Sequence, residues 1–560
     1  MVSYGDQNRG RVKKRRPQSP ISGTGRGDAR MFSWALVALV LVVVSFSVSA
    51  YSFSRYFEGG ISHEFCQYAE IARNVLEGRG FHTATVWTST LAWMDSRGIP
   101  FSQEHLAPVM ARFPLQSALT AGAMLLVGKT DAAPALLSVL MAALCAVATF
   151  VAGCVFFSPL EGFLAALLFV FNPSFQRGFV LWGLPDFGFC FLVLLTVTVL
   201  CWARDQAAAH RETPKLWAAA GLLSGLAFLQ RENLLLWVPL FLWFVWQRGT
   251  GSKKRFLMFC GGLGLGSAPG WIYNLRWFGG ITPPAGAWNL LEHVVQDTSP
   301  WLSYREFSVA EAWPHMDLLA NKFWHYLLWQ LMDFPTLWQM HFLFPFLLVG
   351  AWGLRKQPFV RLMGSMMLVQ LIVFSFLRYE TLGYYVKGRY ILWFAPTAFL
   401  LSMRGASFVG EKLRWGRACP IGLAVLSLGF FGYFWSRPQG GARYPGGLRV
   451  QDWPELRASV DAAGPDGLIA TNLPAQVTWY ARGLSVALPA TPADFLALDR
   501  QHAVTAVLIS RLSPGELYNT PAWGELLGDS GSMKGFCQAS HLIVLKDFGT
   551  SLLLIKSPKA

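Results

Sequence analysis

Charged residues are scarce in this chain of 560 residues, of which only 14% are Asp, Glu, Lys or Arg. A soluble globular protein usually carries charge on about a quarter of its residues. Hydrophobic residues make up 53% of the chain and gather in repeated long runs. The shortage of charge therefore excludes an ordinary soluble enzyme and indicates a polytopic α-helical membrane protein.

Acidic residues are scarcer than basic ones, 32 against 47, which gives a net charge of +15. The basic residues cluster in short segments between the apolar runs, as they do in cytoplasmic membrane loops. An Arg-rich arm for nucleic acid, built from RVKKRR near the N-terminus, is the weaker alternative. The distribution therefore predicts no nucleic-acid partner.

Cysteine pairs with metal-ligand spacing are lacking among the eight cysteines, which excludes a typical zinc site. A disulfide between Cys66 and Cys537 is conceivable, because both are expected outside the membrane. Internal repeats are lacking too, which disfavours a transporter built from inverted halves.

The apolar runs predict about eleven spans, several shorter than the roughly 20 residues of a full crossing. They cover residues 31–53, 132–157, 162–175, 184–203, 216–230, 233–247, 256–273, 336–353, 362–378, 390–403 and 418–435. Alternate connections carry Lys and Arg, with 158–161 as the exception. An odd number of crossings places the N-terminus in the cytoplasm and the C-terminus outside the inner (plasma) membrane.

This topology divides the chain into a basic cytoplasmic tail, 1–30, a transmembrane domain, 31–435, and an extracytoplasmic part, 436–560. The loops 54–131 and 274–335 also face outward. After the linker at 437–447, short strands alternate with helices, which is typical of a small α/β domain. The expected strands are 467–471, 484–488, 504–510, 542–546 and 552–555.

The first outer loop contains ISHEFCQYAEIARNVLEGRGF, residues 61–81, which predicts an amphipathic helix ended by Gly78 and Gly80. It places Glu64 at the membrane edge, where a carboxylate could take a proton from an acceptor hydroxyl or amine. The structural alternative is a first-turn acid in a helix capped by Ser62.

Three further charged positions fall at the outer ends of spans. Asp186 follows Pro185 at the start of a span, and could be catalytic or simply a first-turn acid. Arg231, beside Glu232 in a tight turn, suits a phosphate, although a solvated turn also tolerates this pair.

Arg389 and Tyr390 follow Lys387 in YYVKGRYILWF, where positive charge lies outside against the orientation rule. Pairing with Glu380 would explain this charge; binding of a lipid headgroup or pyrophosphate is the interpretation we favour.

A divalent-cation site is a weaker hypothesis, resting on His63 and Glu64 together with Glu104 and His105. Carboxylate and imidazole donors suit such an ion, but a polar loop is the interpretation we favour for the second pair. No other cofactor is predicted from the sequence.

The order of these motifs along the chain, and their expected position on the outer side of the membrane, resemble those of bacterial membrane glycosyltransferases of the C-type fold (GT-C). This group is related to protein O-mannosyltransferases and lipid A aminoarabinose transferases. The resemblance spans most of residues 31–435. The matching stretches are Glu64–Phe81, Arg112–Leu115, Asn172–Asp186, Gly221–Arg231 and Arg389–Pro396.

The resemblance implies a hexosyl- or pentosyltransferase that uses a polyprenyl-phosphate sugar on the extracytoplasmic face. Glu64 falls where the family has its catalytic acid, more often Asp, and Asp186 falls at a second acidic position. Arg231 and Arg389 fall where the lipid phosphate would bind. The implied partners are the lipid-linked donor, membrane lipid and a glycan, lipid or protein acceptor in the cell envelope.

Two other functions compete with a transferase. A lipid or polysaccharide transporter or flippase would also use outer cations, but predicts charges deeper in the spans and internal symmetry. A membrane scaffold without catalysis, whose outer α/β domain binds a partner, is the third interpretation.

Overall fold

The computed structural model describes residues 27–211, 213–246, 252–296, 299–377, 388–437, 448–511 and 521–557. Three sequence-based predictions fall wholly or mostly outside these ranges: the basic tail, the binding residue Lys387, and the 437–447 linker. Glu380, the suggested partner of Arg389, lies outside them as well.

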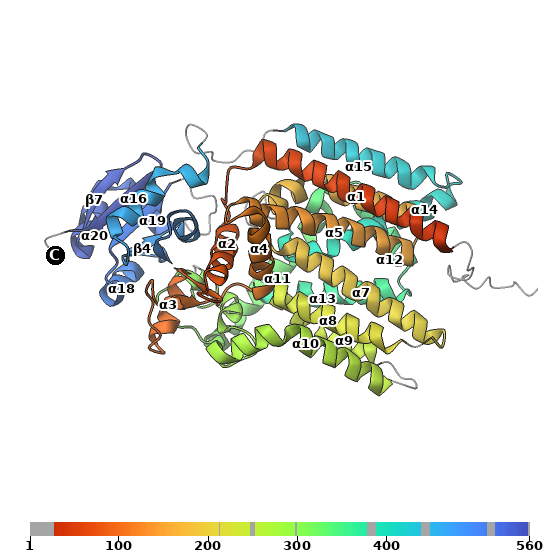
Figure 1. Ribbon diagram of the computed structural model, residues 1–560, viewed down its shortest axis with the longest axis horizontal. Helices are drawn as coiled ribbons and strands as arrows, with labels where there is room; N and C mark the ends of the chain where they lie inside the picture. The colour runs from red at the N-terminus through yellow and green to blue at the C-terminus, as the bar shows by residue number, and fades with distance from the viewer. Residues whose placement is uncertain are drawn as a thin grey trace, which may run out of the picture.

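The predicted apolar runs each contain a helix, and these helices form one elongated bundle (Figure 1). The bundle helices are α1 Gly27–Tyr56, α5 Ala132–Phe156, α6 Pro159–Phe171, α7 Asp186–Ala208, α8 Pro214–Gln230, α9 Val238–Val245, α10 Ser252–Phe278, α12 Phe344–Gly353, α13 Pro358–Leu377, α14 Ala395–Lys412 and α15 Ala418–Ser436.

Six helical segments of the described chain are long and apolar enough to cross a membrane on their own. A pair bent by 109°, Val309–Gln339 with Phe344–Gly353, raises the number to seven if it counts as one span. Helices α6, α9 and α12 have only 13, 8 and 10 residues. The structure thus supports a multi-pass membrane protein, and the count of eleven crossings stays a prediction.

A second group of elements lies between the bundle and the C-terminal sheet, where α2 and α4 cross the end of the bundle (Figure 1). Helix α4 packs against α2, α5 and α8. This group comprises α2 His63–Leu76, α3 Thr88–Asp95, α4 Pro114–Val127, α11 Met316–Asp333, β1 His82–Thr83 and β3 Ala107–Pro108.

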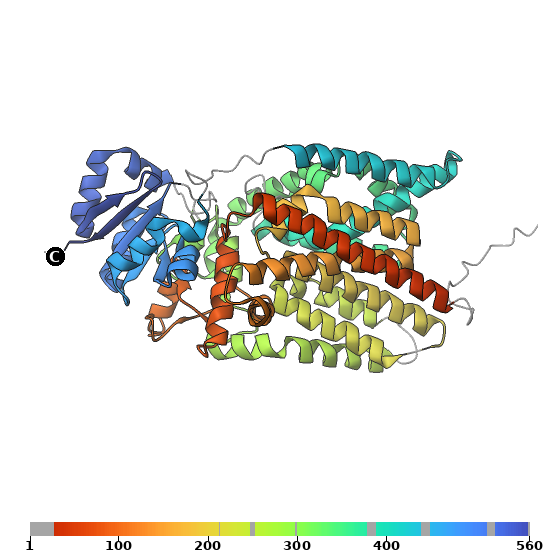
Figure 2. The same ribbon diagram turned by 45° about the horizontal axis from the view of Figure 1, so that its top comes forward.

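The C-terminal strands lie where the sequence predicted them and join a six-stranded sheet at the far end of the molecule (Figure 2). Its order is β2-β5-β4-β6-β8-β7. The pairs β6–β8 and β8–β7 are antiparallel, and the other pairs of these described strands are parallel. The elements are β2 Thr85–Val86, β4 Leu468–Thr471, β5 Leu484–Ala487, β6 Ala506–Ser510, β7 Leu542–Asp547, β8 Ser551–Lys556, α16 Pro454–Ala463, α17 Pro474–Gln476, α18 Pro492–His502, α19 Pro521–Gly528 and α20 Ser530–Ser540.

Strand β2 comes from the first outer loop, so this sheet is not built from the C-terminal segment alone. Thr85 pairs in parallel with Ser485. Arg73 of α2 donates hydrogen bonds to the carbonyl oxygens of Thr478 and Trp479, both at 2.9 Å. Because its polar face is covered in this way, α2 is buried on both sides, whereas the sequence predicted a helix lying on a surface.

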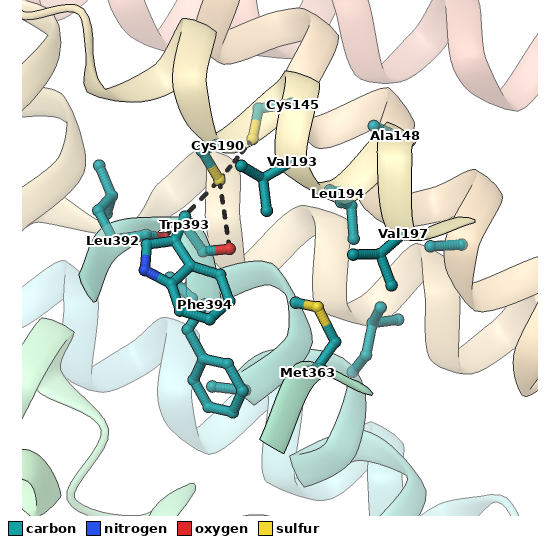
Figure 3. Close-up of a cluster of buried hydrophobic side chains, with 14 of the residues drawn as sticks. Cys145, Ala148, Cys190, Val193, Leu194, Val197, Met363, Leu392, Trp393 and Phe394 are labelled. Atoms are coloured by element: carbon teal, nitrogen blue, oxygen red, sulfur yellow. Dashed lines mark hydrogen bonds between the residues drawn. The ribbon is translucent and has the colours of Figure 1, made fainter. Parts of the chain in front are cut away.

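The bundle core fixes the segment that precedes α14, a 3-10 helix at Arg389–Phe394. Trp393 and Phe394 pack with residues of α5, α7 and α13 (Figure 3). The Cys190 thiol of α7 lies 3.7 and 3.8 Å from the carbonyl oxygens of Leu392 and Trp393. This packing anchors Arg389, two residues before the core residue Ile391, beside the head of α7. Cys66 and Cys537 are both free thiols.

Helices α8 and α10 approach each other through small residues. A Cβ added at Gly221 would lie 2.1 Å from the Phe259 carbonyl oxygen, and one at Gly262 would lie 2.1 Å from that of Ala218. Small residues four apart allow such close contact between membrane helices. The contact positions the end of α8, from which Arg231 follows.

We expect Gly262→Val to force α8 and α10 apart and to lower the free energy of unfolding by about 1–3 kcal/mol, as overpacking usually does. Thermal unfolding of the protein in detergent measures the change. Gly261→Val is the matched control, since a Cβ there meets no atom within 4 Å. Equal stability of the two variants would contradict the proposed close contact.

Candidate functional site

A cavity of about 620 Å³ lies where one end of the bundle meets α2, the segment 274–335 and the C-terminal part. Its lining includes both apolar and polar side chains. The apolar ones include Trp182, Leu235, Leu236, Phe374 and Leu377, and the polar ones include Asn289, Ser299, Asn472 and Gln476. The cavity thus suits a molecule with one apolar and one polar part.

Glu64 enters this cavity from the first turn of α2. Ser62 occupies the N-cap position, but its hydroxyl makes no capping hydrogen bond, so the capping alternative is only partly fulfilled. The Glu64 carboxylate forms a close ion pair with Arg389. Its other oxygen lies 3.7 Å from Nη1 of Arg112. Glu64 is therefore held by two guanidinium groups.

Asp186 is the first residue of α7, directly after Pro185. Its Oδ1 lies 2.8 Å from Nη1 of Arg231, and its Oδ2 lies 3.2 Å from Nε of Arg389. The side chain of Asp186 is only 1% exposed and does not line the cavity. Asp186 therefore lies behind the two arginines and orients them.

Local structure explains why Arg231 faces Asp186. Helix α8 ends at Gln230, and Arg231 continues with an extended backbone. Nε2 of Gln230 donates hydrogen bonds to Oε1 of Gln116, at 2.7 Å, and to the Pro185 carbonyl oxygen, at 3.1 Å. These bonds connect the end of α8 to α4 and to the residue preceding Asp186.

The result is a chain of alternating charges, Glu64–Arg389–Asp186–Arg231, with Arg112 as a second partner of Glu64. Three guanidinium groups face two carboxylates, so the cluster retains one positive charge. Arg112, Arg231 and Arg389 line the cavity. An anion entering it would meet several charge-assisted donors.

Tyr390 completes this cluster. Its ring centroid lies 5.2 Å from Cζ of Arg231 and 5.9 Å from Cζ of Arg389. Its carbonyl oxygen accepts a 2.5 Å hydrogen bond from Gln370 of α13. Such contacts between a guanidinium group and a ring favour a fixed orientation of the arginines.

The ionisable groups of the cavity differ in the direction in which their pKa values are shifted. Burial would raise the pKa of Glu64, but Arg389 and Arg112 outweigh burial and hold the pKa well below its usual range. Burial, helped by Arg112, lowers the pKa of His63 to about 3, so this imidazole is neutral at pH 7. Burial raises the pKa of Glu232 to about 7, against the opposing charge of Arg231.

Sequence reasoning assigned no task to two residues of the cavity. Arg112 belongs to a matching stretch, and its position just before the helix at Pro114 was the available signal. Glu232 was noted only as the neighbour of Arg231, although it begins a 3-10 helix, Glu232–Leu236, and lines the cavity.

The structure gives little support to the cation site. Only His63 and Glu64 of the four suggested residues line the cavity. His105 is exposed and its Nδ1 lies 3.4 Å from the Ser102 hydroxyl. Within the described ranges, no group of three or more His, Cys, Asp or Glu residues has the arrangement of a metal site.

Comparison with known proteins supports a membrane glycosyltransferase. The family model of dolichyl-phosphate-mannose-protein mannosyltransferases matches residues 111–271, which include Arg112, Asp186 and Arg231. Glu64 and Arg389 lie outside the matched segment. No curated protein matches the chain in sequence.

Among solved structures, the chain is similar to ArnT from Cupriavidus metallidurans bound to undecaprenyl phosphate. The TM-score is 0.51 at 12% identity, covering 95% of this chain and 98% of ArnT. The archaeal oligosaccharyltransferase AglB from Archaeoglobus fulgidus, in complex with an inhibitory peptide and a dolichol-phosphate, gives a TM-score of 0.49 at 12% identity. That alignment covers 86% of this chain and 70% of AglB.

The mannosyltransferase match and the fold shared with ArnT agree with the resemblance found in the sequence motifs. The chain therefore shares the C-type fold with ArnT, and its segment 111–271 is similar to the mannosyltransferase family.

Proposed function

We propose that this protein transfers a sugar from a polyprenyl-phosphate donor to a cell-envelope acceptor on the extracytoplasmic face of the membrane. The observation that carries the proposal is the alternating charge cluster, with its surplus positive charge, on the wall of a half-apolar cavity. Such a cavity matches a donor that combines an anionic phosphate with a hydrocarbon chain. The acceptor in this proposal is a glycan, lipid or protein of the cell envelope.

The donor phosphate is proposed to bind Arg231 and Arg389, with Arg112 beside them. Planar guanidinium groups donate two parallel hydrogen bonds to phosphate oxygens, and they remain charged at any pH of interest. Leu235, Leu236 and Phe374 would contact the first isoprene units. The sugar would then project toward the polar side chains of the cavity lining.

Transfer requires cleavage of the bond between the anomeric carbon and the phosphate oxygen. The arginines would stabilise the negative charge that develops on the leaving polyprenyl phosphate. Because Asp186 fixes both Arg231 and Arg389 before the donor arrives, little reorganisation is needed at the moment of reaction. Asp186 is thus a positioning residue in this proposal, since it does not line the cavity.

Glu64 was predicted from the sequence to be the general base. A carboxylate paired with two guanidinium groups is a weak proton acceptor, because protonation would cost both ion pairs. We therefore propose that Glu64 is a positioning residue that keeps Arg389 and Arg112 directed at the cavity, and that the donor phosphate competes with it for these arginines.

The transporter alternative would place the same cations around a lipid headgroup. It predicts movement of a lipid-linked sugar across the membrane without a change in its covalent structure. Sugar transfer by the purified protein separates the two functions: from the lipid-linked donor and the acceptor a transferase forms the glycosylated acceptor, whereas a transporter leaves the donor covalently unchanged. Formation of this product by the wild type, and by no variant of the charge cluster, supports the transferase.

We expect Glu64→Gln to abolish most transfer and to tighten binding of undecaprenyl phosphate by up to about tenfold, because a negative charge competing for the arginines is removed. Calorimetry with undecaprenyl phosphate measures the affinity. Glu77→Gln, at the other end of α2, is the control, since Glu77 pairs with Lys129 and Arg79. Unchanged affinity would contradict the competition, and near-normal transfer would remove Glu64 from the site.

Arg389→Gln should weaken binding of undecaprenyl phosphate by about ten- to a hundredfold, the loss expected for one or two charge-assisted hydrogen bonds. The same calorimetric titration applies. Arg305→Gln serves as the matched control, because Arg305 is exposed and forms its ion pair with Glu311, outside the cavity. Equal affinities of the two variants would exclude Arg389 from the phosphate site.

A further inference from the structure

We infer that Glu232 is the proton acceptor of the transfer step: its carboxylate takes the proton from the acceptor group that attacks the sugar. The inference rests on the proposed transferase function and assigns the base, which the sequence placed at Glu64, to another carboxylate of the same cavity. Glu64 and Glu232 are the acidic residues that line it in the part of the chain described.

Position is the first argument. Glu232 follows Arg231 directly, so it lies next to a proposed phosphate ligand and begins the 3-10 helix that contains the apolar lining residues Leu235 and Leu236. Gly286, from the second outer loop, faces it: a Cβ at this glycine would lie 2.8 Å from Oε1 and 2.9 Å from Oε2 of Glu232. The carboxylate therefore occupies space that only a glycine leaves open.

Pairing is the second argument. Arg231, the cation nearest in sequence, donates its hydrogen bond to Asp186. No ion pair or hydrogen bond to the Glu232 carboxylate is found among the residues that the structure describes. Glu64, by contrast, is held by Arg389 and Arg112. A proton arriving at Glu232 breaks no such interaction.

The surroundings of Glu232 leave its charge uncompensated. The 3-10 helix that it begins packs against α8, α9 and α13. Arg231 is the charged group that acts on it, and burial outweighs Arg231, which raises the pKa of Glu232 to about 7. A base is most effective when its pKa lies near the working pH. The other titratable groups on the cavity wall are His63, Glu64, Tyr68, Arg112, Arg389 and Tyr390.

The chemical step balances without a further reactant. The acceptor oxygen or nitrogen forms a bond to the anomeric carbon, and the bond from that carbon to the phosphate oxygen breaks. Its electron pair leaves with polyprenyl phosphate, next to the arginines. The acceptor proton passes to Glu232, which returns it to water after the products leave.

The test is the pH dependence of kcat/KM in the full-length protein, with donor lipid purified from the deletion strain and acceptor from the same envelope. Wild-type kcat/KM should rise with pH to a plateau, with a midpoint near 7, because Glu232 must be ionised to accept a proton. Glu232→Gln should lose about a hundredfold or more and show no such rise. Its affinity for undecaprenyl phosphate should stay within about twofold of the wild type.

Two variants separate catalysis from structure. Glu232→Asp keeps a carboxylate and should retain the rise with pH at reduced kcat/KM. Gly286→Ala displaces the Glu232 carboxylate and should lower kcat/KM, whereas Gly264→Ala, where an added Cβ meets no atom within 4 Å, should not.

A Glu232→Gln variant that keeps wild-type activity, or the same rise with pH, overturns the inference and leaves the transferase intact. Loss of that rise in Glu64→Gln alone would return the base to Glu64. Absence of any sugar transfer by the wild type would overturn the proposed function and this inference together.

Discussion

The ion pairs of Asp186 are the interaction on which the rest of the site depends. Asp186 is almost fully buried, and a buried carboxylate is tolerated only when opposite charges and hydrogen bonds compensate it. Arg231 and Arg389 provide this compensation, although they lie 45 and 203 residues further along the chain. The head of α7, the end of α8 and the segment before α14 must therefore meet at one point.

The rest of the architecture keeps that meeting point in place. Close packing of α8 on α10 through glycines positions Arg231, and the core around Trp393 positions Arg389. Helix α2 brings Glu64 from the first outer loop, and Arg73 connects the same helix to the C-terminal sheet. The C-terminal part thus contributes to the site by covering α2 and by lining the cavity with Asn472 and Gln476.

Much of the fold could be predicted from the sequence, because long apolar runs indicate membrane helices and short apolar runs indicate strands. Glu64, Asp186, Arg231 and Arg389 could be selected because they are charged residues expected at or near the outer ends of those helices. The structure brings these four residues together. The pairing among them could not be predicted, since it depends on contacts between distant segments. Glu64 therefore looked like an available base, whereas the structure holds it between two arginines. The addition of β2 to the C-terminal sheet was missed because a strand of two residues leaves no periodicity.

The account turns on where the lipid phosphate binds. A cryo-EM structure of the protein with undecaprenyl phosphate tests this most directly. We expect the phosphate within hydrogen-bond distance of Arg231 and Arg389, the prenyl chain along Leu235 and Phe374, and Glu64 displaced from Arg389. A phosphate bound elsewhere, with the ion pairs of Glu64 and Asp186 unchanged, would contradict the account.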